Sequence, residues 1–239
     1  MIDESQRRAA RLIGIAYPLT FAIITGAFFR FYAPFVAWND YAATAGKLMS
    51  HEHDFRLYNA AALIYGIGVV VLLTALYVVL RPISRSLALF AASSRLVYAL
   101  LWFVMQLNLF AALRLMSGVS YLQGFELERL QALAGLQLAS GQDAYYIGLG
   151  FYGLGSAVFS YLWFKSRYVP RTLAVWGLLS SLFEGFCGFA YLVFPRFGSI
   201  VSVNWYELPI GLFELALSFW ILARGLRPPQ TAEALRTSS

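Results

Sequence analysis

The sequence predicts an all-α integral membrane protein, a bundle of six transmembrane helices, and three observations lead to this fold class. Hydrophobic residues make up 60% of the 239 residues and charged residues only 13%, whereas about a quarter of the residues of a soluble domain are charged. Aromatic residues make up 17% of the chain, which excludes a disordered protein. Apolar runs of roughly 20 residues, the length that crosses a bilayer as a helix, recur along the chain.

Six stretches are long and apolar enough to span a membrane. Runs of this length exceed a β-strand and lack the alternation of a barrel strand. No cleavage site for a signal peptidase follows the first run, so we expect it to remain as a transmembrane helix. The last two stretches are apolar but contain glutamates. The predicted spans are residues 12–29, 57–80, 96–113, 144–164, 172–195 and 204–223.

The connections between the predicted spans differ in length. Residues 81–85 and 165–170 are short, which makes the helices on either side of each connection antiparallel neighbours. Residues 35–55 form a polar connection. Within it, the run from His51 to Asp54 (His-Glu-His-Asp) is interpreted as a solvated loop, because adjacent loop residues lack the spacing of metal ligands.

The connection between the third and fourth spans, residues 117–142, has a helical pattern of its own. Leucines at positions 127, 130, 133 and 136 share one face, which predicts an amphipathic helix lying on the outer surface. The chain is expected to form one transmembrane domain over residues 1–227, followed by a polar cytoplasmic tail over residues 228–239.

The charges separate into two layers, which predicts the orientation. One side of the predicted bundle carries eleven basic and three acidic residues, a net charge of +8, and the other carries five basic and six acidic residues, a net charge of −1. The positive-inside rule places both termini in the cytoplasm, with residues 35–55, 117–142 and 195–203 on the outer side of the cell membrane. The basic pI of about 9.5 follows from this topology, so no nucleic-acid partner is expected.

Charged residues inside the spans are the candidate functional residues, since a charge in hydrocarbon usually faces a partner or a wet cavity. Arg95 and Glu214 each lie ten residues from an arginine at the cytoplasmic surface, at a depth of about 15 Å, and we expect them to pair. Glu184 has no second cation at its depth and is expected to be uncharged. Gly185 and Gly188 are expected to leave room beside it.

The neighbours of these charges predict how the helices meet. Glycines and serines share a helical stripe with Glu184 on the fifth span and with Glu214 on the sixth, while Gln106 shares a face with Arg95 on the third. We therefore expect the third, fifth and sixth spans to meet. The predicted ligand or proton pocket consists of Arg95, Gln106, Glu184 and Glu214, and a purely structural ion pair remains the alternative.

Three further polar residues are expected at the outer edge of the bundle. Glu207 has capping-box spacing with Asn204 at the start of the sixth span. Arg30 is expected to extend its side chain to the outer headgroups. Arg56 lies at the start of the second span.

Several classes of chemistry are excluded by residue type. One cysteine excludes a disulfide framework and a cysteine-ligated cluster. The absence of histidine and lysine from the predicted spans excludes a bis-histidine haem and a retinal Schiff base. The chain also lacks a P-loop, a Rossmann fingerprint and a nucleophile elbow. We therefore expect no cofactor, no metal site and no catalytic residues, which argues against an enzyme without excluding one.

Five short motifs together resemble the bacterial domain-of-unknown-function family 4386. They are Phe55-Arg56-Leu57, Leu76-Tyr77-x-x-Leu80-Arg81-Pro82, Ser94-Arg95-Leu96-Val97, Ser166-Arg167-Tyr168-Val169-Pro170-Arg171 and Leu208-Pro209-Ile210-Gly211-x-x-Glu214-Leu215. The resemblance covers about residues 11–225 and implies a six-helix membrane protein with no established activity. Arg56, Arg95 and Glu214 fall on matched positions. A histidine often follows the aromatic-Gly-Leu of the fourth helix in that family, whereas this chain has Gly155.

Three functions stay open on this reading. The first is binding or transport of a small solute or a lipid in an outward-facing intramembrane pocket, coupled to protonation of a glutamate. The second is a structural or partner-binding membrane subunit, in which the ion pair holds helices together. The third, with less support, is a membrane enzyme that uses glutamate acid and base chemistry on a lipid. The expected partners are the lipid bilayer and, for the first function, a small-molecule or lipid ligand, and the oligomeric state is not predicted.

Overall fold

The computed structural model describes residues 2–227 except 38–39, 119–121, 123, 195 and 203; the predicted polar tail, residues 228–239, lies outside the described residues. The described part contains helices and no strand, and six of its helices are long and apolar enough to cross a membrane, which confirms the predicted fold class. These six are α1 (Glu4–Phe31), α3 (Glu52–Leu80), α4 (Arg85–Met116), α5 (Leu127–Ser166), α6 (Arg171–Val193) and α8 (Asn204–Arg224). Shorter elements connect them: η1 (Ala33–Phe35), α2 (Tyr41–Leu48) and α7 (Phe197–Ile200).

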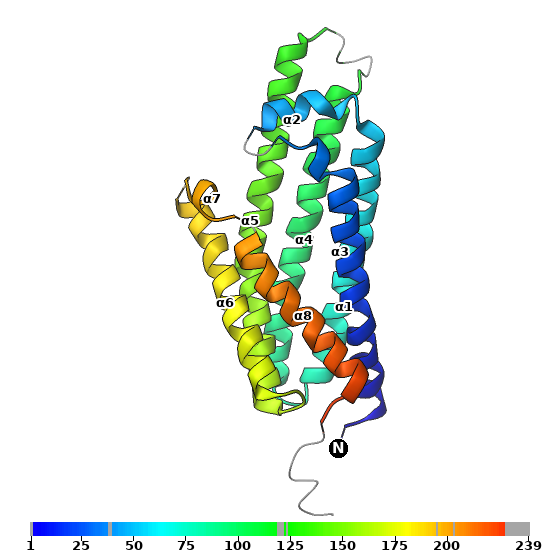
Figure 1. Cartoon of the computed structure of the whole chain (residues 1–239), viewed down its shortest axis with the longest axis vertical. Helices are drawn as coiled ribbons and strands as arrows, with labels where there is room; N and C mark the ends of the chain where they lie inside the picture. The colour runs from blue at the N-terminus through cyan, green and yellow to red at the C-terminus, as the bar shows by residue number, and fades with distance from the viewer. Residues whose placement is uncertain are drawn as a thin grey trace, which may run out of the picture.

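The six long helices form a closed ring. Each packs against the next in the order α1, α3, α4, α5, α6, α8, and α8 packs back against α1. Figure 1 shows α8 running obliquely across the front of the bundle to the foot of α1. The start of α1, the α3–α4 and α5–α6 connections and the end of α8 lie at one end, which we call the basic end.

Local sequence signals explain where the helices begin and end. Asp3 forms a capping box at the start of α1, because its carboxylate accepts the backbone N–H of Gln6 while the Gln6 side chain accepts the backbone N–H of Asp3. The helix α5 ends at Ser166, and the C-cap residue that follows, Arg167, has a left-handed backbone with φ of 58°. The short α5–α6 connection then turns the chain back into the bundle.

The predicted surface helix between the third and fourth spans does not exist as a separate element. Its residues are the first turns of α5, which continues without a break for 40 residues. Two physical reasons explain the continuity. Gly141 sits where a Cβ would lie 3.3 Å from the backbone oxygen of Met105 in α4, so the glycine allows close packing instead of a break. Leu130 and Ala134 are buried in a cluster with residues of α2, so the leucine face has a protein partner.

The polar connection between the first two spans is more structured than predicted. It contains α2, which is capped by Asp40 and buries Ala45 and Leu48 completely. The run from His51 to Asp54 is not a loop, because His51 occupies the position just before α3 and the next three residues form the first turn of that helix. The described residues contain no group of side chains able to hold a metal ion.

Candidate functional site

The interior of the ring holds an ion pair between Arg95 of α4 and Glu214 of α8. The guanidinium Nη1 lies 3.1 Å from the carboxylate Oε1. Arg95 is 3% exposed and the Glu214 side chain 16%, so both partners of the ion pair are largely shielded from solvent. This contact confirms the predicted interaction of the two residues.

Two residues of α5 complete the environment of the pair. Tyr152 donates its hydroxyl hydrogen to the Glu214 carboxylate at 2.6 Å, and its ring lies 4.0 Å from the Arg95 guanidinium carbon. Arg95 Nη1 also donates to Ser156 Oγ at 3.0 Å. The buried Tyr17 of α1 lies within interaction range of both charged groups. Both charges are therefore held by several directed contacts, the arrangement that a buried ion pair needs to be stable.

Gly155 explains how Arg95 reaches this position. A Cβ at residue 155 would lie 2.7 Å from Arg95 Cγ and 2.8 Å from the backbone oxygen of Ala91. Any side chain there would displace the arginine stem or push α4 away from α5. The absence of a side chain at Gly155 is thus coupled to the path of the Arg95 side chain.

Glu184 of α6 lies close to this network but outside it. It is 3% exposed, and its Oε2 has no hydrogen-bond partner within the described part of the chain. Arg95 and Glu214 both lie within electrostatic range of its carboxyl group. Glu184 therefore lies near two charged side chains, but its Oε2 has no direct hydrogen-bond partner in the described part of the chain.

The glycines next to Glu184 do not leave room for a ligand, which corrects the prediction. A Cβ at Gly188 would lie 2.8 Å from Leu149 Cβ, and the nearest atoms to a Cβ at Gly185 belong to the backbone of Gly153. The backbone of α5 fills the space that the missing side chains provide. These glycines serve close packing of α5 on α6.

Gln106 lies on the same buried face of α4 as Arg95, three turns further from the basic end. Both its Nε2 and its Oε1 are buried without a partner among the described residues. Its backbone oxygen accepts a hydrogen bond from Asn59 of α3 at 3.1 Å. The site prediction thus places four residues inside the ring, but only Arg95 and Glu214 touch each other.

Aromatic residues line the interior between these polar groups. Tyr146 of α5 stacks on Tyr191 of α6 with ring centroids 4.1 Å apart, and the Tyr191 hydroxyl donates to the Val201 backbone oxygen at 2.8 Å. Successive ring contacts join Tyr152, Tyr98, Trp102, Tyr145, Tyr146, Tyr191 and Tyr206. A series of aromatic contacts therefore runs through the interior from Tyr152, beside the ion pair, to Tyr206 of α8.

The predicted meeting of the third, fifth and sixth spans is only partly right. The fifth and sixth spans, α6 and α8, do pack together, but α5 lies between α4 and α6 in the ring. Arg95 reaches Glu214 across the interior instead of through a helix–helix interface. This arrangement could not be predicted from the sequence, because the glycines of α5 indicate close helix packing but do not specify which helices pack against α5.

The residues expected at the outer edge lie apart from the network. Arg56 pairs with Glu52 one turn away at 2.7 Å, and Arg30 is exposed with its guanidinium over the Phe31 ring. Glu207 is half-buried, within electrostatic range of Tyr58 in α3. Its predicted cap involves Asn204, whose side chain lies outside the described part of the structure.

Sequence reasoning missed Tyr152 and Ser156. Their four-residue spacing puts both on one face of α5, on either side of Gly155, and this was the available signal. The interior combines a fixed ion pair with unpaired hydrogen-bonding groups, an arrangement suited to holding a polar molecule. It does not assemble a nucleophile with a base among the described residues.

Comparison with known proteins gives one match. A family model described as "Domain of unknown function (DUF4386)" matches residues 12–225, which is most of the chain. Neither the curated proteins nor the solved structures include a match.

Proposed function

The chain belongs to the DUF4386 family, whose function is unknown, and we propose that it binds a small polar solute inside its six-helix ring. The protein is a multi-pass membrane protein, and a solute held at mid-depth is positioned for transport across the bilayer. We further propose that it lies in the bacterial inner membrane with the basic end in the cytoplasm, in line with the positive-inside rule.

The observation that carries the proposal is the set of unpaired polar atoms inside the ring. Glu184 Oε2, Gln106 Nε2 and Gln106 Oε1 are buried without protein partners in the described residues. Each unsatisfied buried polar group costs about 1–3 kcal/mol. Water or a solute that offers donors and acceptors would recover this cost.

The neighbouring ion pair supports a binding role for Glu184. Arg95 is committed to Glu214 and Ser156, so it does not neutralise Glu184 directly. An isolated buried carboxylate is costly, and the group is expected to be an uncharged carboxylic acid. A carboxylic acid can donate and accept hydrogen bonds and can exchange its proton, which would make solute binding sensitive to pH.

The experiment extracts small molecules from the detergent-purified protein at several pH values and identifies them by mass spectrometry. We expect the wild-type protein to retain a polar solute in a pH-dependent manner. Glu184→Gln should fold normally and remove the pH dependence, and Gln106→Leu should lose the solute. Glu128→Gln, which changes an exposed glutamate in the first turn of α5, is the matched control and should behave like the wild type.

A different result would favour the second candidate, a structural membrane subunit. The observation behind that candidate is the buried ion pair, whose contacts with Tyr152 and Ser156 join α4, α5 and α8. Absence of any retained solute, or a pH profile unchanged by Glu184→Gln, would contradict the binding proposal. The interior would then have a structural role.

A further inference from the structure

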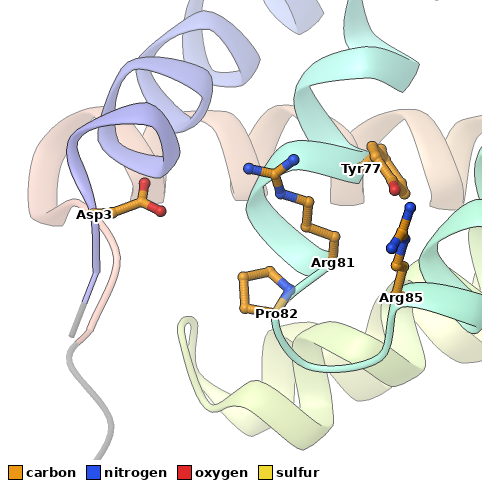
Figure 2. A pocket seen from close by; sticks show the side chains of 5 residues that line it. All are labelled: Asp3, Tyr77, Arg81, Pro82 and Arg85. Atoms are coloured by element: carbon orange, nitrogen blue, oxygen red, sulfur yellow. The ribbon is translucent and has the colours of Figure 1, made fainter.

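The basic end of the bundle contains a pocket that the proposed solute site does not involve. It is open, has a volume of about 450 Å³ and is lined by Asp3, Tyr77, Arg81, Pro82 and Arg85. Figure 2 shows that three elements contribute to it: the start of α1, the end of α3 and the start of α4. The pocket therefore lies where the sequence analysis expects the edge of the bilayer.

The two arginines are available to a ligand. Within the described part of the chain, neither Arg81 nor Arg85 forms an ion pair. Figure 2 shows the Arg85 side chain extending toward Tyr77 and the Arg81 side chain on the side of the pocket that holds Asp3. Two guanidinium groups around one hollow give directed donors that match the oxygen atoms of a phosphate.

The start of α4 adds to the positive potential of the pocket. Ser84 precedes the helix and makes no side-chain capping bond, so the first N–H groups of α4 lack that partner. The N-terminus of a helix favours an anion through these N–H groups and the helix dipole. Arg85 is the first residue of this helix, which brings both features to one place.

Asp3 is the one acidic residue that lines the pocket. Its carboxylate accepts hydrogen bonds from the Gln6 backbone N–H at 2.7 Å and the Ser5 hydroxyl at 2.8 Å. These bonds, together with the nearby positive charge of Arg81, lower the pKa of Asp3, so it stays charged at neutral pH. Its negative charge disfavours a bound anion, but the two arginines keep the net charge of the pocket positive.

We propose that this pocket binds the phosphate group of an anionic lipid. The chemistry of recognition is that of a phosphate oxyanion held by Arg81, Arg85 and the first turn of α4. The lipid is favoured over a soluble phosphate because apolar helix surface adjoins the site: Leu89 lies one turn after Arg85 on the same side of α4 and is exposed. Acyl chains can lie along such a surface while the headgroup occupies the pocket.

The test measures lipid retention by the full-length protein with native mass spectrometry. The protein is released from nanodiscs that contain phosphatidylglycerol and phosphatidylcholine, and a parallel arm titrates inorganic phosphate in detergent. Arg81→Gln combined with Arg85→Gln should weaken phosphatidylglycerol binding about tenfold or more, since bonds to charged groups are the strong ones. Asp3→Asn should strengthen it, because asparagine still caps the helix but removes the opposing charge.

The control is Arg224→Gln, which removes a charge from the basic end outside the pocket. It should leave phosphatidylglycerol retention at the wild-type level. If the control loses as much as the double variant, the attraction is a general effect of basic charge and the proposal is wrong. If inorganic phosphate binds as tightly as the lipid with the same arginine dependence, the phosphate site stands and the lipid assignment is overturned. No arginine-dependent binding in either arm overturns both.

Discussion

Arg95 and Glu214 join helices that are three places apart in a ring of six. The ring order places α4 and α8 opposite each other, and the pair crosses the interior at 3.1 Å with Tyr152 of α5 bonded to the same carboxylate oxygen. A contact of this kind fixes the width of the ring without a direct helix–helix interface. It therefore couples the position of α8 to α4.

This coupling predicts a non-additive stability cycle. Arg95→Met and Glu214→Gln should each lower stability by about 3 kcal/mol or more, because each leaves an unpaired charge in the interior. The double variant should lose clearly less than the sum of the two. Thermal unfolding in detergent measures all three, and additive losses would show that the two side chains are not coupled.

The sequence was sufficient to predict the Arg95–Glu214 pair but not the residues that surround it. Depth along each helix follows from counting residues, so Arg95 and Glu214 could be placed at the same level. The order of the helices around the ring depends on which small residues pack against each other. A stripe of small residues on one helix does not specify which other helix packs against it. For that reason Tyr152 and Ser156 were not predicted, and Gly188 was expected to leave room although Leu149 and the α5 backbone lie against it.

Tyr152 itself can be tested by removing one oxygen atom. Tyr152→Phe keeps the ring over the Arg95 guanidinium but deletes the 2.6 Å bond to Glu214. A hydrogen bond to a charged group contributes about 1.5–3 kcal/mol, so the melting temperature should fall. Tyr98→Phe is the control, because its hydroxyl has only a 3.5 Å contact with the Tyr65 hydroxyl. Equal effects of the two changes would argue against a special role of Tyr152.

The contact of α5 with α6 predicts an asymmetric response to alanine. A Cβ at Gly153 would lie 2.5 Å from the backbone N and Cα of Gly185, whereas a Cβ at Gly185 would meet its nearest atom at 3.4 Å. Backbone atoms cannot move aside, so Gly153→Ala should destabilise the protein by about 1–3 kcal/mol. Gly185→Ala should cost less.

Gly26→Ala provides the matched control for these alanines. No atom lies within 4 Å of a Cβ at that position in α1, and alanine is the better helix former. Its thermal stability should equal or slightly exceed that of the wild type. A Gly153→Ala protein as stable as Gly26→Ala would contradict the close approach of the two helices.

The orientation of the bundle can be measured by cysteine labelling. In a Cys187→Ser background, Ser84→Cys probes the basic end and Ser50→Cys the opposite end. Ser84 makes no capping bond and Ser50 is exposed, so both changes should be tolerated. We expect a membrane-impermeant maleimide added to intact spheroplasts to label position 50 and not position 84. Labelling of position 84 alone would reverse the proposed orientation.

The last prediction asks whether the polar interior is occupied. Gln106→Leu removes two buried polar atoms that have no protein partner among the described residues. In an empty interior this change should stabilise the protein by about 1–3 kcal/mol, because two unpaired groups disappear. If water or a solute pairs with the amide, as we propose, the change deletes those bonds as well, and stability should stay the same or fall. Asn108→Leu on the same helix is the control, since the Asn108 amide bonds the Val104 backbone oxygen of its own helix. A rise in melting temperature confined to Gln106→Leu would therefore show a dry interior and contradict solute binding there.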